Sequence, residues 1–402
     1  MCLIYVLVLK QYFVSFVKNL AFSLQISKIT LSLHIVSVCA HGMNSKDMEK
    51  TTKIRIKDIA LRAGVSEGTV DRVLHNRGEV SAKSREAVEK ALTELNYRPN
   101  IYARTLAMKR QFMFVFFMPQ HAQGDYWDKV EQGIAQAMNE LVDFNVLIEP
   151  YYYDQFNRDS YRAEAERLLN SNPDGVVIVP TFTQETMRLI QRLHEANVPY
   201  SFVDSMVEDE HFVSYYGQHS FQSGWIAAKL LIGDLPKDSE ILLVRMRRAG
   251  EDVSNQTRSR HEGFMRYLET NGLLEDYKIK TQVIDDEEGG LIALRNYIAT
   301  SSSLRAVITF NSKVHRLAQS VLACGRKDIR MIGYDLLEKN VDYLREGIVD
   351  YLIAQCPERQ AYLVLRDLCR NVVLKQPVQK VNYMPIDVLM KENIDYYHTF
   401  ES

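Results

Sequence analysis

Residues 54–110 read IRIKDIALRAGVSEGTVDRVLHNRGEVSAKSREAVEKALTELNYRPNIYARTLAMKR, and the spacing of their apolar side chains decides how the rest of the chain is interpreted. Ile56 and Ile59 begin a helical pattern, which the Ala-Gly-Val turn at 63–65 interrupts after two turns. Ser66 is a suitable N-cap for a second helix, in which apolar residues recur at three- and four-residue steps. Two short helices joined by a tight, Gly-containing turn predict a helix-turn-helix.

A third helical segment follows the first two. Ser81 is its candidate N-cap, apolar residues from Val88 to Leu95 share one face, and Pro99 ends it. Three short helices bury little apolar surface, so such a unit is normally a module of a larger protein. We therefore expect a small all-α headpiece over residues 52–98.

The charge distribution separates this segment from the rest of the chain. Residues 51–110 contain 13 Lys and Arg against 7 Asp and Glu, a net of +6, whereas residues 111–402 carry −11. A basic module attached to an acidic body is typical of a nucleic-acid reader fused to a second domain. The alternative is a small helical bundle with a solvated, mildly basic face, which the Ala-Gly-Val-Ser turn disfavours.

The segment resembles the DNA-binding headpiece of the lactose/galactose repressor (LacI/GalR) family. The residues that carry the resemblance are Asp58-Ile59-Ala60, Ala63-Gly64-Val65-Ser66, Thr69-Val70, Arg72-Val73-Leu74, Val80-Ser81, Arg85, Val88, Leu95-Asn96-Tyr97, Pro99-Asn100, Ala103, Arg104 and Leu106. The resemblance implies that the second helix lies in the major groove of operator DNA. It also implies a hinge, residues 99–110, in which the segment from Asn100 to Met108 becomes helical only on DNA and places Leu106 in the minor groove.

The resemblance further implies a set of DNA contacts. The residues concerned are Ile56, Ser66, Glu67, Gly68, Thr69, Arg72, Asn76, Arg85, Tyr97, Asn100, Arg104 and Leu106. Among basic residues, phosphate contacts are expected at Lys53, Arg55, Lys57, Arg85 and Arg104.

Three positions depart from the family pattern. Glu67 and Gly68 stand where base-reading side chains are usual; Gly has no side chain, and Glu can only accept, for example from cytosine N4. Asp71 stands where a small hydroxyl residue is usual. Base readout is therefore expected from Glu67, Arg72 and Asn76, with Leu106 and DNA deformability contributing indirectly.

The composition fits a globular protein. The 402 residues are 46% hydrophobic and 25% charged, enough for the headpiece and one two-lobed domain. The cysteines are odd in number and lack CxxC spacing; they are Cys2, Cys39, Cys324, Cys356 and Cys369. Neither a zinc site nor a disulfide framework is predicted, and we expect no metal or other cofactor and a reducing, cytoplasmic location.

Residues 1–47 are expected to be a non-native or disordered extension. The first 42 are apolar, but lysines interrupt them, and no run reaches the roughly 18 apolar residues that span a bilayer. In a signal peptide the basic residues precede the apolar core, whereas here the lysines are scattered through it. We favour a translation start at Met43 or Met48, with a membrane anchor and a genuine extension as alternatives.

From Phe112 onward, short apolar runs alternate with helical segments of about ten to fifteen residues. The first run is FMFVFFMP at 112–119, and the last is VDYLIAQ at 349–355. This alternation predicts parallel sheets with right-handed crossovers. About eleven strands are many for one sheet, so we expect two lobes.

The expected two-lobed effector-binding and dimerisation domain covers residues 111–395. Its N-lobe is expected at about 111–215 plus 357–380 and its C-lobe at about 216–355. Ligands of such sheets bind at the carboxyl ends of the strands, so the cleft between the lobes is the expected site.

This region resembles the type I periplasmic-binding-protein fold, a two-lobed Rossmann-like α/β domain, over residues 111–390. The matches include SNPDGVVIVP, VPYSFVD, GQHSFQSGWIAAKLL and IGYD. The family positions that touch an effector are Tyr126, Trp127, Asp204, Arg260, Asn311, Asp335 and Gln355. His219 replaces the usual Asp of a GQDS motif and is added as a candidate.

These residue types suit a sugar, which has apolar faces and a rim of hydroxyls. Tyr126 and Trp127 can stack on a face, while Asp, Asn, Gln and Arg can satisfy the hydroxyls. As alternatives, the two aromatic residues belong to the core, Asp204 and Asp335 cap helices or join the lobes, and Arg260 pairs with a structural carboxylate. His219 is either a pH-sensitive contact or a packed residue.

Enzyme classes find little support in the sequence. It contains no GxSxG, GxxxxGK[ST] or HExxH, no GxGxxG after a strand, and no metal-ligand spacing among its histidines. The acidic run at 285–288 is either a weak cation site or, preferably, a solvated loop.

Together, these features predict a cytoplasmic, ligand-responsive transcriptional regulator, preferably a repressor. It is expected to bind double-stranded operator DNA as a homodimer, with a sugar or sugar derivative as effector and no membrane association. The tail beyond Ile394 has no leucine heptads, which favours a dimer over a tetramer. The alternatives are a solute-binding receptor without a DNA role and, less favoured, a hydrolase or kinase on the same scaffold.

Overall fold

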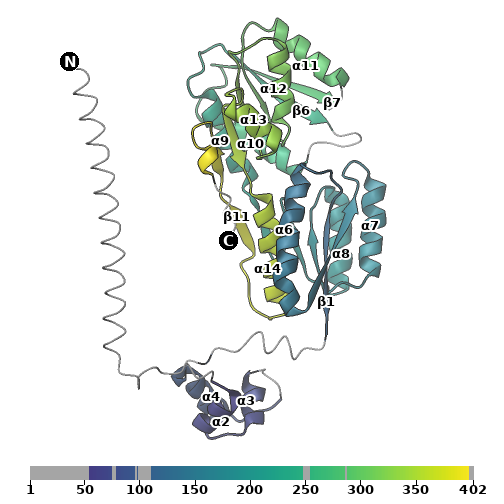
Figure 1. Cartoon of the computed structure of the whole chain (residues 1–402), viewed down its shortest axis with the longest axis vertical. Helices are drawn as coiled ribbons and strands as arrows, with labels where there is room; N and C mark the ends of the chain where they lie inside the picture. Colours follow the sequence, from purple (N-terminus) through teal and green to yellow (C-terminus); the bar gives the residue numbers. More distant parts are fainter. Residues whose placement is uncertain are drawn as a thin grey trace, which may run out of the picture. The chain divides into compact units, whose positions relative to one another are not determined.

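The computed structural model describes residues 54–74, 78–95, 97, 110–247, 254–285 and 288–397. The chain divides into two compact units between Pro99 and Asn100 (Figure 1). The predicted N-terminal extension, Lys53, Asn76 and hinge residues 99–109 lie outside the described residues.

The described residues of the first unit, from Ile54 to Tyr97, form three short helices, as the sequence predicts. They are α2 (Ile56–Ala63), α3 (Glu67–Leu74) and α4 (Ala82–Glu94). Each contributes one fully buried side chain to a common core: Ile59, Val70 and Val88.

Local interactions set the ends of these helices. Gly64 ends α2 with φ +67°, a left-handed conformation that side-chain-bearing residues adopt at a cost. Ser66 Oγ accepts a hydrogen bond from the Thr69 amide at 3.2 Å, and Ser81 Oγ accepts one from the Ser84 amide at 3.2 Å. The predicted capping roles of Ser66 and Ser81 are therefore confirmed.

The second unit consists of two lobes, each built on a six-stranded sheet. The first sheet has the order β11-β5-β4-β3-β1-β2. Its strands are β1 (Phe112–Pro119), β2 (Val146–Tyr153), β3 (Gly175–Ile178), β4 (Tyr200–Val203), β5 (Tyr215–Gln218) and β11 (Val381–Met384). Every pairing in this sheet is parallel, as predicted from the alternating pattern.

The second sheet has the corresponding order, β12-β10-β9-β8-β6-β7. Its strands are β6 (Glu240–Arg247), β7 (Lys278–Asp285), β8 (Leu304–Thr309), β9 (Arg330–Tyr334), β10 (Tyr351–Ala354) and β12 (Asp387–Leu389). Only β12 runs antiparallel to its neighbour.

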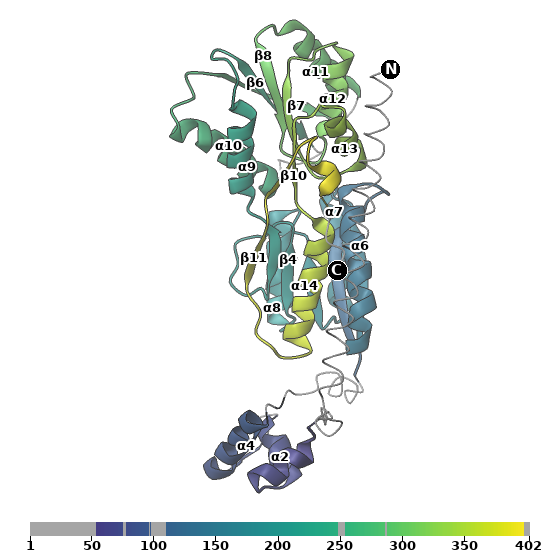
Figure 2. The same cartoon turned by 60° about the vertical axis from the view of Figure 1, so that its left-hand side comes forward.

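Helices cover both faces of each sheet. On the first lobe these are α6 (Tyr126–Leu141) and α14 (Pro357–Val372) on one face, and α7 (Arg158–Asn170) and α8 (Thr183–Glu195) on the other. On the second lobe they are α9 (Ser220–Ile232) and α10 (Asn255–Thr270) on one face, and α11 (Glu288–Thr300), α12 (Val314–Ala323) and α13 (Glu338–Arg345) on the other. Figure 2 shows α9 and α10 side by side. The described part of the unit also contains the 3-10 turns η1 (Val142–Phe144) and η2 (Ile394–Tyr396).

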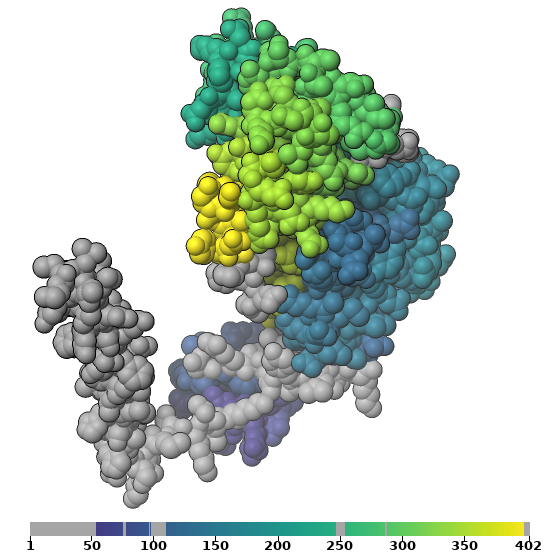
Figure 3. Space-filling view, turned by 45° about the horizontal axis from the view of Figure 1, so that its top comes forward, coloured from purple at the N-terminus to yellow at the C-terminus, as the bar shows by residue number. Residues whose placement is uncertain are grey.

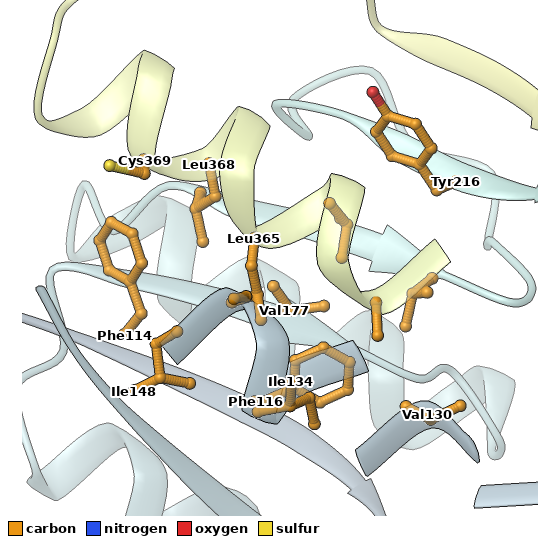
Figure 4. Close-up of a cluster of buried hydrophobic side chains, with 14 of the residues drawn as sticks. Phe114, Phe116, Val130, Ile134, Ile148, Val177, Tyr216, Leu365, Leu368 and Cys369 are labelled. Atoms are coloured by element: carbon orange, nitrogen blue, oxygen red, sulfur yellow. The ribbon is translucent and has the colours of Figure 1, made fainter. Parts of the chain in front are cut away.

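The apolar run FMFVFFMP explains the double-sided core of the first lobe. Successive side chains of β1 point to opposite faces, so Phe114 and Phe116 join the cluster under α6 and α14, while Val115 and Phe117 join the cluster under α7 and α8. Figure 4 shows the first cluster, with Leu365 of α14 lying over the strands.

The lobe boundaries differ from the expected ones. All of β5 belongs to the first sheet, although residues 216–218 were expected in the C-lobe. Residues 381–384 complete the first sheet, and β12 with η2 belongs to the second lobe, on whose surface the C-terminal segment (yellow) lies in Figure 3. These strands of three or four residues are too short to give a clear pattern in the sequence.

The chain therefore crosses between the lobes three times, after β5, β10 and β11. The Gln218 side chain joins the three crossings, because its Nε2 donates to Ala354 O at 2.8 Å and to Pro385 O at 3.0 Å. Among the described residues, no helix is long and apolar enough to cross a membrane.

Candidate effector cleft and DNA-reading surface

The two lobes place an aspartate at equivalent positions of their sheets. Asp204 follows β4 and Asp335 follows β9, and these are the third strands in from the same edge of each sheet. Both have left-handed backbone conformations, with φ values of +69° and +71°. Asp is among the few non-Gly residues that adopt this conformation with any frequency. The same backbone conformation therefore holds a carboxylate at the end of the corresponding strand in each lobe.

A chain of hydrogen bonds links these carboxylates where the two lobes meet. Tyr126 Oη donates to Asp204 Oδ1 at 2.6 Å, and Gln256 Nε2 donates to the same oxygen at 3.2 Å. Gln256 Nε2 also donates to Gln355 Oε1 at 3.0 Å, and Gln355 Nε2 donates to Asp335 Oδ1 at 2.6 Å. The chain thus runs from α6 in the first lobe to the end of β9 in the second.

Arg260 is the most buried charged residue near this chain, with 1% of its surface exposed. Its Nη1 donates to Phe310 O at 2.9 Å, and its guanidinium lies 4.0 Å from the centroid of the Tyr334 ring. Its Nε and Nη2 have no hydrogen-bond partner among the described residues. These two parallel N–H donors form the edge of Arg that binds paired oxygen acceptors, and leaving them buried and unsatisfied is costly.

Burial changes the acidity of two groups in this hydrogen-bonded chain. It raises the pKa of Asp335 to about 6; Arg260 and the Gln355 hydrogen bond act against this rise, and Asp204 and Glu358 add to it. Burial, together with the carboxylates of Asp204 and Asp335, also raises the pKa of Tyr126 well above its ordinary value. The Tyr126 hydroxyl therefore stays protonated and acts as a donor.

Five of the eight predicted effector residues lie in this cluster: Tyr126, Asp204, Arg260, Asp335 and Gln355. The other three have different surroundings. Trp127 packs in the core cluster under α6, with its ring edge-on to Tyr126 at 4.9 Å. Asn311 Oδ1 accepts from Thr309 Oγ1 at 3.1 Å and from the Lys313 amide at 3.0 Å.

His219 lies at the first crossing between the lobes and is exposed. Its Nδ1 accepts from the Gln222 amide at 3.2 Å and so caps α9, and its ring packs against Tyr383 at 4.8 Å. The Asp usual at this position has the same capping chemistry, which accounts for the substitution without an effector contact.

Gln256 was missed in the sequence analysis. It lies one helical turn before Arg260, on the same face of α10, and this spacing is the one signal in the sequence that could have indicated it. A lone Gln in a helix gives no chemical pattern, so only the fold shows that it faces Asp204.

The headpiece presents most of its predicted reading residues to solvent. Ser66, Glu67, Gly68 and Arg72 are exposed at the start and along one side of α3, and Thr69 is half-buried. Ser66 Oγ and Thr69 Oγ1 lie 2.9 Å apart.

The remaining described DNA candidates sit at the edges of this surface. Ile56 and Tyr97 pack partly against the headpiece core, Arg85 is half-buried, and Arg55 and Lys57 are exposed at the start of α2. This arrangement leaves one helix face free to enter a groove with basic residues beside it.

Comparison with known proteins gives matches to both units. Residues 55–100 match the family of bacterial regulatory proteins of the lacI type, and residues 114–375 match a periplasmic binding protein domain. The HTH-type transcriptional repressor PurR of Pasteurella multocida is 25% identical over 287 residues, covering 70% of this chain and 81% of that protein. The ribose operon repressor of Lactococcus lactis is 24% identical, covering 70% and 80%.

Solved structures of similar proteins agree with these two family matches. A putative LacI transcriptional regulator from Bacteroides fragilis is 36% identical, with a TM-score of 0.67, covering 72% of this chain and 100% of that one. A glucose-galactose binding protein from Geobacillus stearothermophilus, 20% identical with a TM-score of 0.61, shares the fold.

A helix-turn-helix headpiece joined to a two-lobed binding domain defines a DNA-binding transcriptional regulator with its own ligand sensor. The chain belongs to the LacI family of bacterial regulatory proteins. The family and the fold class predicted from the sequence are thereby confirmed.

Proposed function

We propose that this regulator represses transcription in the cytoplasm, and that a small polyhydroxylated effector bound between its lobes controls its affinity for operator DNA. The observation that carries the proposal is the buried, unpartnered edge of Arg260 beside the carboxylate chain of Asp204 and Asp335. The relatives are transcriptional regulators, and the cleft groups are donors and acceptors suited to binding, so we propose that the protein is not an enzyme.

The chemistry of the cleft favours a neutral sugar or polyol. A hydroxyl accepts from Arg260 and donates to a carboxylate at the same time, so a vicinal pair of hydroxyls satisfies both kinds of group. Asp335 interacts electrostatically with two other carboxyl groups, Asp204 and Glu358, and with one guanidinium, Arg260, and this excess of carboxyl groups disfavours an anionic ligand. Similar solved proteins include one in complex with D-arabinose and one with bound D-allose.

A thermal-shift screen of the full chain tests this choice, because a ligand that binds only the folded state raises the melting temperature. Neutral monosaccharides and polyols are expected to include a hit, whereas the matching sugar phosphates and sugar acids are expected to give none. A hit found only among the anionic compounds would contradict the proposed effector class.

We propose that the protein acts as a homodimer. Exposed apolar side chains gather near the edge strand of each sheet: Met138, Val142 and Leu147 around β2, and Val283 and Ile292 around β7. Burying such groups against a second copy would place two headpieces on the two halves of a pseudo-palindromic operator. Effector binding would then favour one lobe arrangement and change the spacing of the paired headpieces.

The competing function, a solute-binding receptor without a DNA role, has less support. The fold of the second unit is compatible with it. The matched headpiece and its exposed α3 have no use in such a receptor.

Arg72 is expected to contribute to operator choice. On an operator selected from random DNA, Arg72→Ala should weaken binding by about 1–3 kcal/mol and relax the preference at one or two base pairs. Lys90→Ala, an exposed change on α4 outside the proposed contacts, should leave that preference intact. Binding-site selection followed by gel-shift titration measures both. An unchanged base preference in Arg72→Ala would show that this side chain does not read bases.

The raised pKa of Asp335 predicts how effector affinity depends on pH. Effector hydroxyls donate to the ionised carboxylate, so the Kd should rise about tenfold between pH 8 and pH 5 as Asp335 gains a proton. The unliganded fold responds in the opposite sense. The stability that Asp335 contributes to the unliganded fold is fully present below its ordinary pKa of 3.8 and is lost as the pH rises through its raised pKa of about 6. Calorimetric titration across this range, with Asp335→Asn as the pH-independent control, checks the prediction; a flat wild-type profile would refute it.

A further inference from the structure

The first turn of α10 makes contacts across the cleft through two adjacent side chains. Asn255 Nδ2 donates to Thr183 Oγ1, at the first residue of α8 in the opposite lobe, at 3.0 Å. The next residue, Gln256, donates to Asp204 Oδ1 at 3.2 Å and lies 3.4 Å from Asp204 O. One helical turn therefore touches the other lobe at two places, one at the exposed rim and one inside.

The base of this turn is held firmly in its own lobe. Ser254 caps α10, because its Oγ accepts from the Thr257 amide at 3.3 Å and donates to Thr257 Oγ1 at 3.0 Å. Farther along, the backbone of α10 lies directly against α9: a Cβ added to Gly224 would fall 1.9 Å from Arg260 O. Since α10 cannot shift freely within its lobe, its first turn moves with the lobe as a whole.

The inner contact, from Gln256 to Asp204, uses an oxygen that also accepts a hydrogen bond from Tyr126. Asp204 Oδ1 accepts one hydrogen bond from Tyr126 Oη, on α6 of its own lobe, and another from Gln256 Nε2, on α10 of the other lobe. These two helices follow the first strands, β1 and β6, of their respective lobes. Gln256 Nε2 also reaches Gln355 Oε1, so the same amide joins the aspartates of both lobes through one intermediate side chain.

We propose that Asn255 and Gln256 form an interlobe clasp, in which Asn255 holds the rim to Thr183 and Gln256 positions Asp204 for the effector. Closing the lobes brings both contacts together, and opening them breaks both. The Asn255–Thr183 hydrogen bond is neutral and contributes modestly, and the Gln256–Asp204 bond contributes more because its acceptor is a carboxylate. Together they shift the balance between open and closed forms without locking it. Only the consequence for effector binding rests on the proposed function; the clasp itself requires neither effector nor DNA.

The test traps the closed form in the full chain. A short bis-thiosulfonate reagent is added to the double variant Asn255→Cys with Thr183→Cys, and peptide mapping quantifies the specific cross-link. The clasp predicts that the peptide joining positions 183 and 255 forms efficiently in the double variant and is absent when either substitution is made alone, whatever the native cysteines do. Because the rim bond is absent in this background, closure then depends on Gln256.

Adding Gln256→Leu to the same background should slow cross-linking at least threefold, and Gln256→Glu should also slow it, because a second carboxylate would face Asp204. Arg266→Ala, an exposed change nearly three turns farther along α10, is the matched control and should cross-link at the unmodified rate. Melting temperatures close to that of the parent would show that the variants fold.

Two results would overturn the clasp: no specific cross-link between positions 183 and 255, or equal rates with and without Gln256→Leu. Either result can occur while effector and operator binding remain intact, so failure of the clasp is distinguishable from failure of the proposed function.

Discussion

Arg260→Met is expected to weaken effector binding at least about 100-fold. The buried edge formed by Nε and Nη2 offers two charge-assisted hydrogen bonds, each worth roughly 1.5–3 kcal/mol, and Met removes both while filling a similar volume. The measurement is a calorimetric titration with the compound that gives the largest thermal shift. Operator binding without effector should persist, because the headpiece is a separate compact unit.

Arg266→Met is the matched control for this change. Arg266 lies on the same helix but is exposed and pairs with Glu269 three residues later, so its loss should leave the Kd within about twofold. Retained tight binding in Arg260→Met would show that the effector does not use this edge.

Gly263→Ala is expected to cause the largest loss of stability of any single methyl addition to α10. Its new Cβ would lie 1.9 Å from Phe221 O and 3.1 Å from Trp225 N, both backbone atoms of α9. Neither atom can move alone, so the helices must separate, and overpacking of this kind costs about 3 kcal/mol or more. Chemical denaturation of the full chain should show a clear fall in the midpoint of the second unit's transition.

Gly289→Ala adds the same methyl group where it meets nothing within 4 Å, at the start of α11. Because Ala favours a helix more than Gly does, its midpoint should be unchanged or slightly raised. Equal stability of Gly263→Ala and Gly289→Ala would mean that α9 and α10 do not pack as closely as described.

The headpiece and the long strands show how much of the molecule could be predicted from its sequence. The headpiece was predictable because caps, a left-handed Gly and helical spacing are local signals, and α2, α3 and α4 follow them. The long strands were predictable because runs such as FMFVFFMP are buried on both faces.

The lobe boundaries were not predictable in the same way. A strand such as β5 or β12 is defined by its partners in the same sheet, β11 and β10 respectively, which come from distant parts of the chain, and three or four residues carry no period of their own. The pairing with strands from distant parts of the chain therefore determines where these short strands form and to which sheet they belong.

The candidate site shows the same division. Tyr126, Asp204, Arg260, Asp335 and Gln355 were predicted by their resemblance to family positions at strand and helix ends, and the fold brings them together. Their roles as effector contacts remain predictions. Trp127 and His219 have side chains that suit a sugar site, but core packing and helix capping occupy them here.

The central claim is that a small molecule in the cleft controls DNA affinity through Asp335. The most direct measurement is the operator Kd of the full chain, titrated with the effector found by thermal shift, for the wild type and for Asp335→Asn. The account predicts that saturating effector changes the wild-type Kd at least tenfold, and that Asp335→Asn binds the operator equally well but responds only at far higher effector concentrations. An unchanged wild-type Kd at saturation, or the same response in both proteins, would contradict it.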